Sequence, residues 1–261
     1  MSRMECLYKN FVNTTTLISV NNGTSNVVYL IDRKPDYQFQ SAGDNSDLTT
    51  TSIRIDFTDT ENIDHIAIQN CNWKSFIIYY NSNAANVITP TSMLTNTTVW
   101  ATNSETSLYI YFATTAVQSV FFDITATMVA NEEKKCGDIY IGKRYLQFEN
   151  NPTAKDYKVK RKRKEYVHEM ANGGWSQYVL DTSYYADISL SYVTASETSL
   201  LLDLYDEDTE FVFVPFPTGT SWDGQLYEVN WIGEYTFDQP AANNYTDVGY
   251  KGVMKLRETP R

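Results

Sequence analysis

Histidine and cysteine are scarce in this sequence, which narrows the chemistry open to it. The 261 residues include 2 histidines and 3 cysteines. Cys6, Cys71 and Cys136 lie roughly 65 residues apart, so no two have the short spacing of a metal site, and an odd number leaves at least one unpaired. We therefore expect three reduced thiols in a protein that folds in a cytosol.

Long apolar runs are missing as well, and basic residues are fewer than acidic ones. The first six residues have no apolar stretch of the kind found in secretory signals, and no segment approaches the roughly 18 apolar residues of a membrane span. The 21 basic residues face 32 acidic ones, a net charge of −11, so nucleic-acid phosphates would repel most of the chain. These absences predict a protein without membrane contact and without sequence readout of nucleic acid.

The sequence contains no arrangement typical of a catalytic or cofactor site. His65 lies in residues 63–68, whose pattern predicts a half-exposed position on a strand. His168 follows a basic run and has no serine, cysteine or carboxylate at motif spacing. Phosphate loops, nucleophile elbows, zinc helices and dinucleotide fingerprints do not occur. We therefore predict a protein that is not an enzyme, with no catalytic residues and no cofactor.

Two acidic groups are the candidates for a calcium site. Residues 203–208 hold four carboxylates but lack the glycine and the distal glutamate of an EF-hand loop, which favours a solvated helix end. Residues 56–61 hold three carboxylates around a predicted turn between strands, where β-sandwich modules sometimes hold a structural calcium ion. The second alternative stays open, but our prediction is that no metal is bound.

The residues that are abundant favour strands. Aromatic residues make up 14% of the chain, with 20 tyrosines, and they accompany many β-branched residues. Apolar side chains alternate with polar ones in residues 53–57, 108–112 and 120–128, and turn-forming residues separate such runs. Short alternating strands with polar turns are typical of sandwiches and barrels. The fold class we predict is all-β, with two β-sandwich, jelly-roll-like domains.

One helix and one domain boundary interrupt this pattern. Thr194 and Glu197 form a capping box, and Leu200, Leu201 and Leu204 then fall on one face, which predicts a short helix at 197–206. The charged run 130–135 follows one predicted strand and precedes another. We place the boundary there, giving domains 1–133 and 134–261.

A basic arm at 155–167 is the strongest charge anomaly in the sequence. Seven of the 21 basic residues lie between positions 155 and 164. A solvated hairpin and a nuclear-localisation or nucleic-acid segment are two alternatives. We favour a third, in which the arm contacts an acidic surface of a neighbouring copy. The residues assigned to this subunit-interface arm are Lys158, Lys160, Arg161, Lys162, Arg163 and Lys164.

Two stretches in the first half resemble discoidin-like jelly rolls. Residues 52–57 have the order hydrophobic-x-hydrophobic-Asp-hydrophobic, and residues 63–73 have a matching Ile-Asp-x-Ile-Ala-Ile strand that ends in Asn-Cys-Asn-Trp. The resemblance covers about 30 residues. It implies a jelly roll that is structural in some members of the family and binds glycans or lipids through loop tips in others.

The second half, from about 136 to 261, resembles tail and baseplate proteins of long-tailed bacteriophages in the order of its segments. An opening strand at 137–143 precedes a variable arm, a strand at 186–192, the predicted helix and a terminal strand at 249–258. The resemblance implies a virion structural protein that forms a homo-oligomeric ring or tail-tip complex with other tail proteins. Such a protein would be made in the host cytoplasm and found in the virion.

The alternative function is a carbohydrate-binding module used to attach to a host surface. A sugar's apolar face stacks on an exposed aromatic ring. The aromatic residues near loops that could serve in this way are Trp73, Tyr79, Tyr80 and Trp100. A host glycan is then the additional partner.

Overall fold

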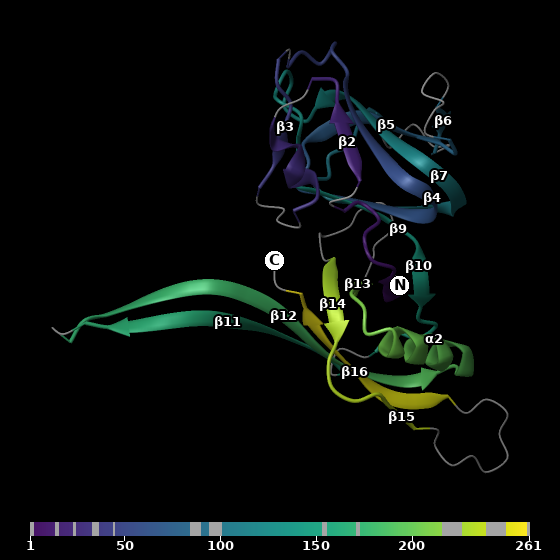
Figure 1. Cartoon of the computed structure of the whole chain (residues 1–261), viewed down its shortest axis with the longest axis vertical. Coiled ribbons are helices and arrows are strands. Elements are labelled where there is room, and N and C mark those ends of the chain that lie inside the picture. The colour runs from purple at the N-terminus through teal and green to yellow at the C-terminus, as the bar shows by residue number, and fades with distance from the viewer. Residues whose placement is uncertain are drawn as a thin grey trace.

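The structure, a computed structural model, contains two sheet-built lobes that follow one another along the long axis of the molecule (Figure 1). It describes residues 3–259 except 14–15, 23–24, 33–36, 44, 84–89, 94–100, 153–155, 171–172, 216–225 and 239–248, and it leaves the side chains of 180–182 undescribed.

The first lobe is built on two long antiparallel strands, β4 (Thr51–Gln69) and β7 (Leu108–Thr127). Its sheet has the order β2-β4-β7-β5-β6, and β9 pairs with the second half of β4. The β4–β7 register shifts near the middle, so both strands contribute one half to each layer of a β-sandwich. The other elements are β2 (Leu17–Val20), η1 (Ser25–Leu30), β3 (Phe39–Gln40), β5 (Trp73–Asn81), β6 (Thr91–Ser92), β8 (Lys135–Cys136) and β9 (Asp138–Gly142).

The alternation in the sequence decides which face of this sandwich is buried. Successive side chains of a strand point to opposite faces. Ile53, Ile55 and Phe57 of β4 therefore enter the core, where Phe122 and Ile124 of β7 meet them. Burying each such side chain stabilises the fold by about 1.5–3 kcal/mol. The polar residues between them lie on the outer face of the lobe.

The second lobe is an eight-stranded antiparallel sheet with the order β10-β1-β13-β14-β16-β12-β11, and β15 pairs with β16. Helix α2 (Ala195–Asp206) packs on one face. β11 and β12 extend far beyond the rest of the sheet as a two-stranded arm (Figure 1). The strands are β1 (Glu5–Leu7), β10 (Arg144–Gln147), β11 (Tyr157–Glu169), β12 (Trp175–Val193), β13 (Phe211–Val214), β14 (Tyr227–Trp231), β15 (Thr236–Asp238) and β16 (Tyr250–Glu258).

Helix α2 begins where the sequence predicts. The Thr194 hydroxyl accepts a hydrogen bond from the Glu197 backbone N–H, and the Glu197 carboxylate accepts one from the Thr194 backbone N–H. This capping box satisfies N–H groups that have no partner inside the helix. Leu201 and Leu204 are buried against Phe211 and Phe213 of β13.

The two lobes share an apolar junction. Val212 and Val214 of β13 alternate with the residues that face α2, so they lie on the opposite face of the second sheet. There they pack with Leu7 of β1 and with Ala67 and Tyr109 of the first lobe. The second half of β4 is consequently buried on both of its faces.

The fold-class prediction is confirmed, since the described residues form antiparallel sheets in sandwich packing with a short helix in the C-terminal half. The predicted turn near residues 58–62 is wrong, because β4 continues through that segment with a register shift. The boundary between 133 and 134 stays a prediction, although strand pairing crosses it in both directions. β1 pairs with β13, and β9 pairs with β4.

Candidate functional site

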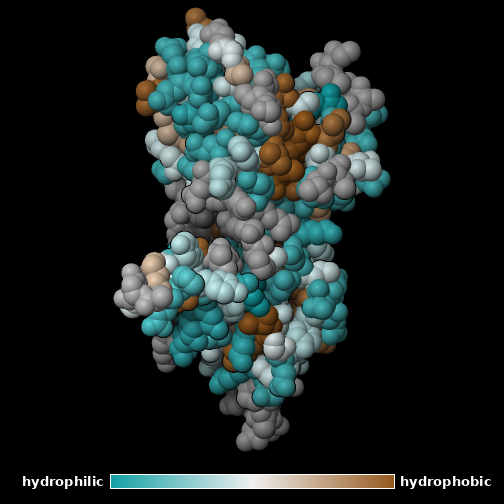
Figure 2. All heavy atoms as spheres, turned by 60° about the vertical axis from the view of Figure 1, so that its left-hand side comes forward, coloured by the Kyte–Doolittle hydropathy of each residue, from teal (hydrophilic) through white to brown (hydrophobic). Residues whose placement is uncertain are grey.

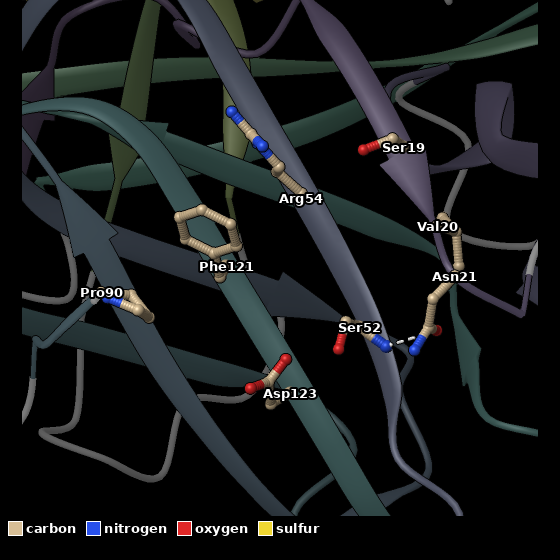
Figure 3. Close-up of a pocket in the computed structure, with 8 residues that line it drawn as sticks. All are labelled: Ser19, Val20, Asn21, Ser52, Arg54, Pro90, Phe121 and Asp123. Carbon is tan, nitrogen blue, oxygen red and sulfur yellow. Dashed lines mark hydrogen bonds between the residues drawn. The ribbon is translucent and has the colours of Figure 1, made fainter. Parts of the chain in front are cut away.

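A hollow of about 400 Å³ lies on the outer face of the first lobe (Figure 3). The surface of this lobe carries hydrophobic residues gathered in one area and bordered by hydrophilic ones (Figure 2). Strands β2, β4 and β7 supply most of the lining of the hollow. The residues that line it are Ser19, Val20, Asn21, Ser52, Arg54, Pro90, Phe121 and Asp123.

Strand register brings the lining residues together. Ser19 lies opposite Arg54, Arg54 lies opposite Phe121, and Phe121 lies opposite Tyr79. Directly opposed residues in an antiparallel sheet have Cβ atoms about 4.5–5.5 Å apart and point to the same face. A row of four side chains therefore crosses the outer face from β2 to β5. Ser52 and Asp123, also directly opposed, begin the next row.

The Arg54 guanidinium is held in place inside the hollow. Its Nε donates to Oδ1 of Asp56 at 2.8 Å, and the same oxygen accepts the hydroxyl of Ser119 at 2.6 Å. The guanidinium carbon lies 5.3 Å from the centre of the Phe121 ring, within cation–π range. The ion pair and the ring together fix the direction in which the remaining N–H groups point.

Asn21 and Asp123 complete the polar lining. The Asn21 side-chain oxygen accepts the backbone N–H of Ser52 at 2.8 Å, and its amide nitrogen donates to the carbonyl of Thr50 at 3.2 Å. Within the described part of the chain, the Asp123 carboxylate has no hydrogen-bond or ion-pair partner, so it is available as an acceptor. The hollow thus combines a cation, a free carboxylate, an oriented amide and an aromatic ring.

The aromatic residues predicted to contact a glycan lie in different environments. Tyr79 is half-buried and lies beside Phe121 at the hollow. Tyr80 packs against the first core. The prediction for Trp73 is wrong, because its ring is 0% exposed and fills the core between the two layers. Trp100 lies outside the described residues.

Sequence reasoning missed Arg54, Phe121 and Asp123. The alternation in residues 53–57 placed Arg54 on an outer face, which is a usable signal. What the sequence did not reveal is the register that puts β4 and β7 side by side, since the opposed residues lie more than 60 positions apart.

His65 is buried between two carboxylates, so the expectation of a half-exposed histidine is wrong. Its Nδ1 contacts Asp64, and its Nε2 lies 3.6 Å from Oε2 of Glu5. Burial would raise the pKa of Asp64, but hydrogen bonds from His65 and from the Arg144 backbone N–H hold it below its usual value. The His65 side chain is 3% exposed, so a substrate has no access to this group.

The same network joins the lobes. Glu5 of β1 accepts the Tyr109 hydroxyl of β7 at 2.6 Å and the Gln147 amide of β10 at 2.6 Å. Arg144 donates at 3.4 Å to Oε1, the same Glu5 oxygen that accepts the Gln147 amide, and the Tyr109 hydroxyl donates to Oε2. Burial, followed by the nearby Glu5 charge, raises the pKa of Tyr109, which keeps its hydroxyl a donor. Glu5 is 4% exposed, so it is a buried charge with several donors around it.

The three thiols are buried and free, as expected for reduced cysteines. Burial raises the pKa of Cys71 to about 11. Among the described residues, no group of three or more His, Cys, Asp and Glu side chains is placed to hold a metal ion. Nor does the described part of the chain include a helix long and apolar enough to cross a membrane.

The arm residues form a continuous basic surface. Along β11 every second residue points to the same side, so Lys158, Lys160, Lys162 and Lys164 share one face, and Arg161 and Arg163 lie on the other. The Lys160 ammonium is 2.9 Å from a carboxylate oxygen of Asp187 on β12. The Lys162 ammonium lies 4.7 Å from the centre of the Tyr185 ring.

No protein-family model matches the chain, and a search of curated proteins finds no match. Solved structures do match. They include CpGH89CBM32-6 produced by Clostridium perfringens, at 16% identity and a TM-score of 0.41 over 52% of this chain and 99% of that one. They also include chitosan-binding module 1 from a Paenibacillus sp. IK-5 chitosanase/glucanase, at 10% identity and a TM-score of 0.44 over 51% and 98%. A third is the lectin binding domain of Lectinolysin complexed with Lewis b, at 10% identity and a TM-score of 0.40 over 52% and 96%. At these sequence identities and TM-scores, the ligands of the matching structures say nothing about a ligand of this chain.

Proposed function

We propose that this chain is a non-catalytic attachment protein that binds a glycan in the hollow of its first lobe. The observation that supports this most is the side-by-side placement of Arg54, Phe121 and Asp123 in the lining of one hollow, where Arg54 and Asp123 are partly exposed. Sugar hydroxyls both donate and accept hydrogen bonds. A guanidinium supplies donors to them, and a free carboxylate accepts from them.

The aromatic residues complement the polar ones. A pyranose ring has an apolar face that packs on an aromatic ring, while its hydroxyls point outward to polar groups. Tyr79, which is half-buried, provides ring surface beside Phe121, which is itself 9% exposed and whose ring lies under the Arg54 guanidinium. Because these side chains lie on paired strands rather than loops, the site is rigid before the ligand arrives.

The test is a glycan array followed by calorimetry on the best ligand. We expect Asp123→Asn to weaken binding by about tenfold or more, since it removes a charged acceptor worth about 1.5–3 kcal/mol. Asp59→Asn is the matched control, because Asp59 is an exposed carboxylate on β4 outside the hollow. A chain that binds no glycan on the array, or an Asp123→Asn variant that binds as tightly as the control, contradicts the proposal.

A second candidate function is structural assembly, as the resemblance to tail and baseplate proteins implies. The observation that favours it is the arm of β11 and β12, which extends away from both lobes (Figure 1). An isolated two-stranded hairpin is marginally stable in water, so a projecting arm gains most of its order from a partner. Light scattering over a range of protein concentrations tests this function. Particles larger than a monomer support it, and a monomer at every concentration contradicts self-assembly.

A further inference from the structure

The outer strand of the arm, β11, forms an open edge of the sheet. β11 is the last strand of the eight-stranded sheet, and in the part of the chain that the structure describes no strand pairs with the outer side of its backbone, which spans 13 residues, or about 43 Å. The side chains from Lys158 to Glu169 are all exposed. Such an edge is a template for pairing with another chain unless its side chains prevent it.

The side chains restrict the partner to an acidic one. Residues 157–164 carry six basic residues and no acidic residue, a net charge of +6. Because the whole chain has a net charge of −11, the rest of the chain carries −17. Two β11 edges placed together would set lysine and arginine against lysine and arginine, which destabilises the pairing. The arm therefore does not pair with a second arm, and a symmetric arm-to-arm dimer is disfavoured.

Asp187 on β12 forms an ion pair with Lys160 of the lysine row. The basic face also continues onto β16, where Arg257 lies opposite Tyr185, with its guanidinium carbon 5.6 Å from the ring centre. Lys160, Lys162 and Arg257 thus surround one tyrosine. The three cations could bind carboxylates of a partner, and the tyrosine ring between them could contact an apolar or aromatic side chain.

The complementary surface lies on the other side of the second lobe. Residues 203–208, at the C-terminal end of α2, present the exposed carboxylates of Asp203, Asp206, Glu207 and Asp208. The last turn has no basic residue, so these charges add to the negative end of the helix dipole. In Figure 1 the arm extends to the left and α2 lies to the right, so the two surfaces of one copy do not meet.

We infer that the arm of one copy docks, through its lysine face, on the acidic C-terminal end of α2 in a second copy. The inference rests on the assembly function proposed above and names its partner and contact. Because the two surfaces are different and lie on opposite sides, the contact is head-to-tail, which generates a ring if the rotation closes and a filament if it does not. The opposite charges of the two surfaces set the orientation of the contact and make its affinity depend on the salt concentration.

A reciprocal charge exchange tests the contact. Variant one carries Lys158→Glu, Lys160→Glu and Lys162→Glu, which changes the lysine face of residues 158, 160, 162 and 164 from +4 to −2 and makes it acidic. Variant two carries Asp203→Lys, Asp206→Lys and Glu207→Lys, which changes the net charge of residues 203–208 from −4 to +2 and makes its helix end basic. Each variant alone has like charges on both surfaces, and we expect its self-association, measured by sedimentation velocity, to fall about 100-fold or more.

Mixing the two variants should restore association, because each arm then meets a helix end of opposite charge. Arg3→Glu with Lys9→Glu and Lys74→Glu is the control for the net charge of variant one, since it makes the same change of −6 at three exposed residues outside the arm. Circular dichroism verifies that each variant is folded, and glycan binding in the hollow should not change.

The outcomes are distinct. A wild-type chain that stays monomeric overturns both self-assembly and this contact. A chain whose variants assemble as well as the wild type overturns the contact alone. Restoration by mixing supports it, and failure to restore overturns it. Binding of the wild-type arm to single-stranded DNA or to anionic vesicles, without self-association, assigns the face to a different polyanion and also overturns the inference.

Discussion

Removing the Glu5 carboxylate is the perturbation with the largest expected effect on stability. In Glu5→Ala, the Tyr109 hydroxyl and the Gln147 amide each lose an acceptor at 2.6 Å inside the junction between the lobes. A buried donor left unpaired costs about 1–3 kcal/mol. His65 and Arg144 also lose a nearby negative charge. We expect the free energy of unfolding to fall by about 3–5 kcal/mol.

Urea denaturation followed by circular dichroism measures this loss. Glu234→Ala is the matched control, because Glu234 is exposed, and its replacement should change stability by about 0.5 kcal/mol or less. Glu5→Gln keeps the shape and one acceptor oxygen, so it should fall between the two. Calorimetry adds a second readout, since a weakened junction should separate the unfolding of the two lobes. A loss below about 1 kcal/mol in Glu5→Ala would refute the view that this network joins them.

Two further predictions follow from pKa values in the structure. With its pKa at about 11, Cys71 should be a thiolate in about one molecule in a thousand at pH 8. A thiol reagent should therefore label Cys71 only after the chain unfolds. Rapid labelling of the folded chain would contradict this prediction. The pKa of Asp64 is lowered in the fold, so its contribution to stability is present above the pKa of about 3.9 in the unfolded chain and is lost as the pH falls toward the folded value. Asp64→Asn should therefore flatten the acid branch of the stability curve, and an unchanged acid branch would show that Asp64 does not contribute.

Local patterns in the sequence were sufficient to predict the strands and the helix. The alternation in residues 53–57 and 120–128 identified the buried faces of β4 and β7, because side-chain direction in a strand depends only on position. The capping box at Thr194 and Glu197 located α2, because both of its hydrogen bonds connect residues three apart.

The sequence was insufficient where the partners of a residue are far away along the chain. Lys134 belongs to a charged run that is typical of an exposed linker. In the structure it is fully buried, and its ammonium donates to the carbonyls of Asn45 and Ser46, 89 and 88 residues earlier. A buried lysine is tolerated when its charge is hydrogen-bonded, and composition alone does not show such acceptors. The pairing of β1 with β10 and β13 could not be predicted for a similar reason, since both of these strands lie in the second half of the chain.

The two proposed binding surfaces impose different physical demands, and the fold meets them with different elements. A glycan needs donors and acceptors held at fixed distances, and Arg54 and Asp123 lie on central strands whose register is fixed on both sides. A neighbouring subunit needs an accessible charged edge, and β11 is an edge strand whose six basic residues, between 158 and 164, begin beside the part of β12 that pairs with β16. The outer part of the strand, residues 165–169, carries two glutamates and no lysine or arginine, so the basic charge is confined to the inner part. Six basic residues within seven positions give this stretch a positive potential even though the protein as a whole is acidic. Because the arm and the hollow belong to different lobes, charge changes on the arm should alter assembly without changing affinity in the hollow.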